Sequence, residues 1–135
     1  MTNRQRHARA PSFFTTFVLL ALTDLALRFL GFARSIALAR RLAGNKTETG
    51  ASAVTQEVAR RVALAGVFYP GRARCLEQSL ALYVLLRRRA VPAQLRLGVQ
   101  PYPFTAHAWV ELDGVALNER PETISQFVPM QDFAV

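Results

Sequence analysis

Residues 75–89 read Cys-Leu-Glu-Gln-Ser-Leu-Ala-Leu-Tyr-Val-Leu-Leu-Arg-Arg-Arg, a run with large apolar side chains at most helical positions. A helix that is apolar around most of its circumference is normally buried among other elements. The arginines that end the run lie where the negative end of a helix dipole favours cations. We therefore predict a helix over residues 75–89 at the centre of the fold.

The pattern changes after Pro92, where apolar and other residues begin to alternate. The apolar positions are Leu95, Leu97 and Val99. Residues 106–112, Ala-His-Ala-Trp-Val-Glu-Leu, alternate in the same way, and the dipeptide Asp113-Gly114 then predicts a hairpin turn into a third strand over residues 115–119. Helices followed by antiparallel strands predict an α+β fold.

Two more helical regions precede residue 75. Residues 12–42 are apolar except for a narrow polar stripe at helical spacing, and Gly31 is placed to divide them into two helices. Residues 52–65 carry apolar side chains on one face. Residues 44–50, between these regions, have the composition of a linker.

The chain length bounds the number of domains. A chain of 135 residues can bury a core without disulfides and is too short for two independent domains. We expect residues 1–11 to form a flexible basic tail and residues 12–50 to form apolar helices and a linker. Residues 51–135 should form the core, packed with residues 12–50 as one domain.

The net charge is +8, and the cations lie almost entirely before residue 105. A basic surface favours anionic partners such as acidic peptides or phospholipid. Nucleic acid is not expected, because no groove-reading motif accompanies the arginines. The apolar run near the N-terminus is interrupted by Asp24 and Arg28 before it could span a bilayer. We therefore expect a cytoplasmic protein that can also bind peripherally at a membrane surface.

Cys75 is the single cysteine, so no disulfide can form within the chain, and two histidines leave too few ligands for a structural zinc site. A lone cysteine beside leucines is usually a small buried apolar residue. At the start of a helix, however, unpaired N–H groups and the dipole stabilise a thiolate, and Arg72 and Arg74 act in the same direction.

His107 is a candidate base for this thiol, because the predicted hairpin returns Asn118 and Glu119 to its side. A third group must fix the imidazole tautomer and support the imidazolium. A two-residue Asp113-Gly114 loop makes Asn118 the diagonal neighbour of His107, whereas a three-residue loop with Gly114 as a bulge places Glu119 opposite it. We favour Glu119, since a carboxylate supports an imidazolium better than an amide does.

Three stretches together resemble the leader peptidases of lasso-peptide biosynthesis, which are transglutaminase-like cysteine proteases. They are the run from Cys75, Leu-Gly-Val-Gln-Pro-Tyr-Pro-Phe over residues 97–104, and Ala-His-Ala-Trp-Val-Glu-Leu-Asp-Gly-Val-Ala-Leu-Asn-Glu over residues 106–119. The resemblance implies a papain-like core with Cys75 as nucleophile, His107 as base and Glu119 as orienting acid. The family usually has Asp at that third position, so Glu119 is a departure.

The resemblance also implies partners. Such a peptidase cuts a ribosomal precursor after its leader, without a metal or other cofactor, and a separate cyclase then closes the ring. Because the first fifty residues read as helices, leader binding should depend on a separate recognition protein.

Two other functions fit the same residues. A transglutaminase or acyltransferase would use the same triad with an amine as acceptor. A non-enzymatic basic amphipathic protein would bind a membrane or partner, and Cys75 would then be buried and inert toward alkylation.

Overall fold

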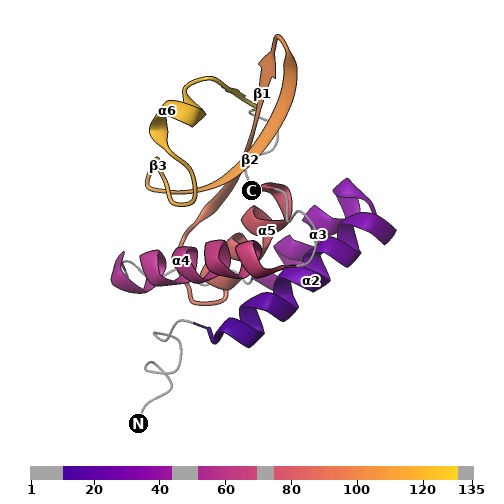
Figure 1. Ribbon diagram of the computed structural model, residues 1–135, viewed down its shortest axis with the longest axis vertical. Helices are drawn as coiled ribbons and strands as arrows, with labels where there is room; N and C mark the ends of the chain where they lie inside the picture. Colours follow the sequence, from indigo (N-terminus) through magenta and orange to yellow (C-terminus); the bar gives the residue numbers. More distant parts are fainter. Residues whose placement is uncertain (1–10, 44–51, 70–74, 131–135) are drawn as a thin grey trace.

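The computed structural model describes residues 11–43, 52–69 and 75–130. Helix α5 (Cys75–Arg87) lies at the centre, and its residues from Ser79 to Leu86 are all buried. It contacts α2 (Phe13–Phe29), α3 (Phe32–Ala43) and α4 (Ser52–Phe68), which surround it (Figure 1). The sequence prediction of a central apolar helix over this region is confirmed, with the helix ending two residues earlier.

Gly31 divides the N-terminal apolar region into two helices, as predicted. α2 is capped by Ser12, whose side chain accepts from the backbone N–H of Thr15, and it ends at Phe29. Gly31 has φ of +80°, a conformation that glycine adopts without strain, and α3 begins at the next residue. Across the described residues, none of the helices is both long and apolar enough to cross a membrane.

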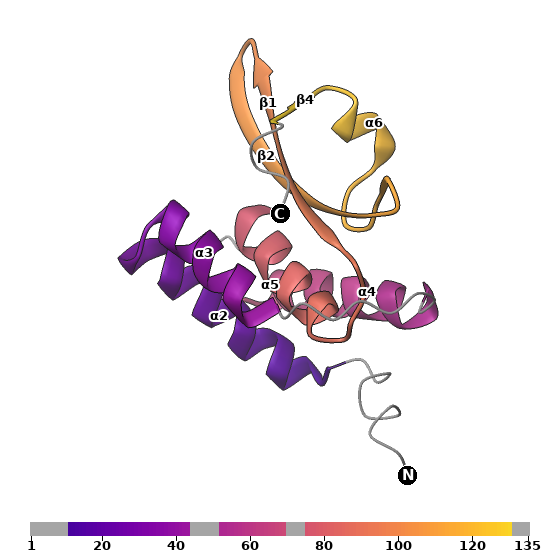
Figure 2. The same ribbon diagram turned by 180° about the vertical axis from the view of Figure 1, so that it is seen from behind.

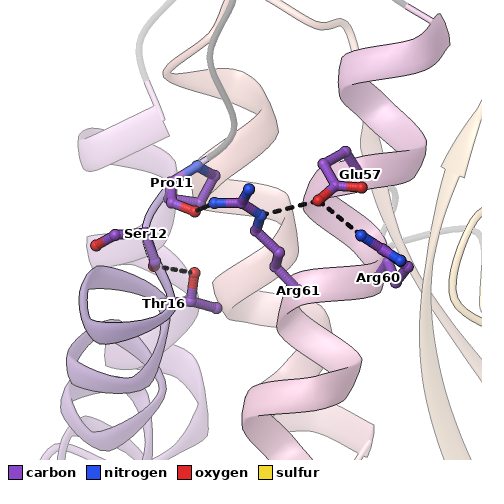
Figure 3. A network of polar contacts seen from close by, with 6 residues as sticks. All are labelled: Pro11, Ser12, Thr16, Glu57, Arg60 and Arg61. Atoms are coloured by element: carbon purple, nitrogen blue, oxygen red, sulfur yellow. Dashed lines mark hydrogen bonds and ion pairs between the residues drawn. The ribbon is translucent and has the colours of Figure 1, made fainter.

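A polar network fastens the start of α2 to α4 (Figure 3). The Arg61 side chain donates to the Glu57 carboxylate, 3.0 Å away, and to the backbone carbonyl of Pro11. Thr16 donates to the Ser12 carbonyl at 2.9 Å. Pro11 is buried, so this last residue of the predicted tail is fixed to the helices.

Several predicted features lie outside the described residues. They are residues 1–10 of the tail, the linker at residues 44–50, and the two arginines at positions 72 and 74.

An antiparallel sheet follows the helices. It comprises β1 (Gln94–Pro101), β2 (Phe104–Leu112), β3 (Val115–Ala116) and β4 (Val128–Pro129), in the order β3-β2-β1-β4. Its inner face carries Leu95 opposite Val110 and Leu97 opposite Ala108, and these four residues share the core of α5. The short α6 (Pro121–Ile124) lies beside the β1–β2 hairpin (Figure 2). The predicted α+β fold is confirmed.

The hairpin after β2 corrects two sequence predictions. Leu112 pairs with Val115, so the loop has the two residues Asp113 and Gly114, not the favoured three-residue bulge. Both loop residues have positive φ, +52° and +78°, which is the primed turn whose twist matches the flanking strands. The third strand was predicted to reach residue 119 but ends at Ala116.

Candidate active site

The site is built around His107, on β2. Its Nε2 atom lies 2.6 Å from the Oε2 atom of Glu119, and the two side chains are 17% and 22% exposed. Glu119 follows the end of β3, on a segment that is no longer paired in the sheet. The predicted contact between this histidine and this carboxylate is therefore present.

Glu119 is held as a carboxylate by its neighbours. Burial raises its pKa, but a hydrogen bond from the Arg120 backbone N–H, at 3.0 Å, and the hydrogen bond and charge of His107 outweigh that effect. The pKa of Glu119 is therefore lowered from its ordinary value. A group that stays ionised beside an imidazole can support a positive charge on the ring.

Two aromatic rings stack on His107. The Trp109 ring centroid lies 6.2 Å away at 27° between planes, and that of Phe127 lies 5.2 Å away at 28°. Trp109 is fully buried and donates from Nε1 to Glu111, which also receives a hydrogen bond from Arg96. The stacked rings and the Glu119 hydrogen bond together define the orientation of the imidazole.

Helix α5 is joined to β2 by a second polar network. The Ser79 hydroxyl donates to the Ala108 carbonyl at 3.0 Å and accepts from Asn118 Nδ2 at 3.0 Å. Asn118 Oδ1 in turn accepts from the Val110 N–H at 2.9 Å. The side-chain oxygen of Asn118 therefore accepts the hydrogen bond that a backbone carbonyl of a longer β3 would have accepted. This replacement explains why the chain leaves the sheet just before Glu119.

Cys75 is the first residue of α5, partly buried and packed on the core. It lies one turn before Ser79 on the same helix face. Ser79 contacts the carbonyl of Ala108, the residue after His107 in β2, so Cys75 lies one helical turn of about 5.4 Å before the point at which α5 contacts β2.

The His107 ring leaves β2 on the face opposite to α5. Ala108 and Val110 point to the other face of the strand, and they are the residues that pack in the core with α5. Within the described part of the chain, no hydrogen bond joins His107 to Cys75. The structure thus pairs the candidate base with the carboxylate, and it places the candidate nucleophile on the helix that packs against the other face of β2.

Sequence reasoning missed three residues of this region, Ser79, Asn118 in its actual role, and Phe127. Ser79 had a signal, since it is a polar residue inside an otherwise apolar helix. Phe127 lies in a C-terminal stretch with no periodic pattern, and it reaches His107 because the next residue, Val128, begins β4, which pairs with β1. Among the described residues, no group of three His, Cys, Asp or Glu side chains is arranged to hold a metal ion.

Comparison with known proteins agrees with this architecture. The family model of the Transglutaminase-like superfamily matches residues 18–132. The chain is also 43% identical over 47 residues to the Microcin J25-processing protein McjB of Escherichia coli. That alignment spans 35% of this chain and 23% of the relative. No solved structure matches significantly. Because the family model covers most of the α+β fold just described, the chain belongs to the Transglutaminase-like superfamily.

Proposed function

We propose that this chain is a cysteine peptidase that removes the leader from a ribosomally made lasso-peptide precursor. The observation that carries the proposal is the pairing of His107 with Glu119 at 2.6 Å, on a strand whose next residue, Ala108, contacts the helix that Cys75 begins. The similarity to a microcin-processing protein supports a peptide precursor as the substrate.

In this proposal Cys75 is the nucleophile. The first backbone N–H groups of a helix have no partner within the helix, and with the dipole they stabilise negative charge that develops at its first residue during the reaction. The Cys75 N–H is then also a natural donor to the oxyanion that forms on the attacked carbonyl.

His107 exchanges the proton. Its Nε2 atom is engaged by Glu119, so Nδ1 is the nitrogen that remains for the thiol. Glu119 accepts the ring N–H, fixes the tautomer and supports the imidazolium, which is the role of the third group in such triads. Trp109 and Phe127 hold the plane of the ring.

The reaction proceeds by acyl transfer to sulfur. His107 takes the proton of the Cys75 thiol, and the sulfur bonds to the carbonyl carbon of the last leader residue. The peptide C–N bond then breaks, and the departing core amine takes that proton from His107. Water then gives a proton to His107 and its oxygen to the thioester carbon. The leader leaves as a carboxylic acid and the thiol is restored.

The proposal extends to partners. The N-terminal residues that the structure describes form helices, and we infer that a separate recognition protein delivers the leader and that a cyclase consumes the freed core. The basic residues before position 105 would favour an acidic leader.

The test incubates the purified full chain with a candidate recognition protein and a candidate precursor peptide, and mass spectrometry identifies the products. We expect loss of the leader as a free acid, and no cleavage by Cys75→Ala or His107→Ala proteins whose circular dichroism is unchanged. Cleavage by a folded Cys75→Ala protein would overturn the mechanism. Leader joined to an added amine, without hydrolysis, would identify a transglutaminase instead.

A further inference from the structure

Helix α2 presents a continuous apolar face to solvent. Five large side chains on it are exposed: Phe14, Val18, Leu22, Leu25 and Phe29. At about 100° per residue they fall within about 80° of the helix circumference, directly opposite the buried residues Thr16 and Leu20. The inner face of α2 packs on α4 and α5. The outer face is therefore left exposed among the residues that the structure describes.

The apolar face continues onto α3. Leu22 of α2 and Leu38 and Leu42 of α3 line the same apolar groove, whose volume is about 220 Å³. Leu38 and Leu42 are themselves 40% and 44% exposed. We call the five residues of α2 with Leu38 and Leu42 the α2–α3 face.

The border of the α2–α3 face is cationic. Arg34, Arg40 and Arg41 are exposed on α3, and the Arg28 side chain is 71% exposed on α2. By helical spacing Arg34 and Arg41 stand directly beside Leu38. Asp24 is the single acid in these two helices; its side chain is 15% exposed and pairs with Arg28 at 3.1 Å, so the positive charge of the border comes mainly from the arginines of α3.

We propose that the α2–α3 face binds the surface of a membrane that contains anionic lipids, with α2 lying in the plane of the surface. Phe and Leu on one side and arginines at the border are the composition of interfacial helices, whose apolar residues enter the acyl region while cations meet phosphate groups. A protein interface of this size would normally carry polar groups for hydrogen bonds, whereas the outer face of α2 has only apolar side chains.

The proposal also fixes the orientation of the active site. In both ribbon views α2 lies toward the opposite end of the molecule from the tip of the β1–β2 hairpin (Figures 1 and 2). With α2 on the lipid, the segment that carries His107 and Glu119 would face water. A bound peptide could therefore reach the site without leaving the aqueous phase.

The test is cosedimentation of the full chain with vesicles of phosphatidylcholine alone or with about one-third phosphatidylglycerol. We expect binding that needs the anionic lipid and weakens several-fold on raising salt from about 0.05 to 0.5 M. Leu25→Glu with Phe29→Glu should reduce binding at least about tenfold, because two apolar side chains leave the acyl region. Arg34→Gln with Arg41→Gln should reduce it several-fold and leave the apolar face intact.

The matched control is Val115→Glu, since Val115 is 64% exposed but lies on β3, away from α2. It should bind vesicles like the unchanged protein. Circular dichroism of each variant checks that it is folded. A folded, monomeric protein that stays in solution with both vesicle types would overturn the proposal. So would a dimer that Leu25→Glu dissociates and that ignores vesicles, because the face would then serve a second copy.

Discussion

His107 Nε2 lies 2.6 Å from Glu119 Oε2, although β3 ends at Ala116, three residues before Glu119. Strand pairing therefore does not bring the two side chains together. In the observed two-residue register His107 would face Arg120, and Asn118 would be its diagonal neighbour. Asn118 instead turns its amide to Ser79 and Val110, and the chain leaves the sheet so that Glu119 reaches the imidazole.

Glu119→Gln should lower the rate of leader cleavage by about 10²–10⁴-fold, the range expected when support for the acid–base imidazole is lost. The amide keeps the shape and a hydrogen bond but not the charge that supports an imidazolium. The measurement is kcat for precursor cleavage, with Glu122→Gln as control because Glu122 is exposed on α6. Equal rates for the two variants would remove Glu119 from the mechanism.

The same variant gives a stability readout. Because the pKa of Glu119 is lowered in the folded protein, its charged form contributes stability above the unfolded pKa of about 4.3, and this contribution is lost as pH falls through the folded pKa. The difference in unfolding free energy between the unchanged protein and Glu119→Gln should be full near pH 7. It should shrink below about pH 4. A difference that grows in acid would contradict the pairing.

The hairpin shows why sequence reasoning reached the correct contact for an incorrect reason. The dipeptide Asp113-Gly114 correctly predicted a tight turn with Gly114 at positive φ. The two-residue and three-residue loops differ by only one residue, and both allow glycine at position 114. The dipeptide alone therefore does not determine the loop length. The side-chain amide that ends the ladder is a tertiary contact to α5, which no local pattern contains.

The long elements were predictable because their side chains repeat over many residues. Strands β1 and β2 were identified from the alternation of their side chains, α5 from its long apolar run, and Gly31 marked the break between α2 and α3. The C-terminal stretch was not predictable in this way, since α6 and β4 are short and β4 depends on pairing with Gly98 and Val99 of β1. For this reason the sequence patterns did not predict that Phe127 is part of the site.

Asn118→Ala should lower the free energy of unfolding by about 1–3 kcal/mol, because it leaves the buried Val110 N–H without an acceptor. Ser79→Ala should lower the free energy of unfolding by a similar amount, because it leaves the Ala108 carbonyl without the hydroxyl that donates to it. The double variant should lower the free energy of unfolding by less than the sum of the two single changes, as expected for side chains that share one network. Urea denaturation measures all three, and Ser125→Ala, whose hydroxyl bonds only at the surface, is the control. Strict additivity would show that the two residues act independently.

Gly98→Ala tests whether the stacked rings position His107. An added Cβ at residue 98 would lie 2.7 Å from the Trp109 ring and 2.9 Å from the Phe127 Cβ, closer than such atoms approach. Trp109 is fully buried, so the rings must shift, at a cost of about 1–3 kcal/mol.

Both rings stack on His107, so this shift should also lower kcat for leader cleavage while leaving KM nearly unchanged. The control is Gly66→Ala in α4, where the added Cβ meets only the flexible end of Gln78 and alanine favours the helix. We expect that control to keep kcat and to match or exceed the stability of the unchanged protein. A Gly98→Ala protein that loses stability but keeps full kcat would limit Trp109 and Phe127 to a packing role.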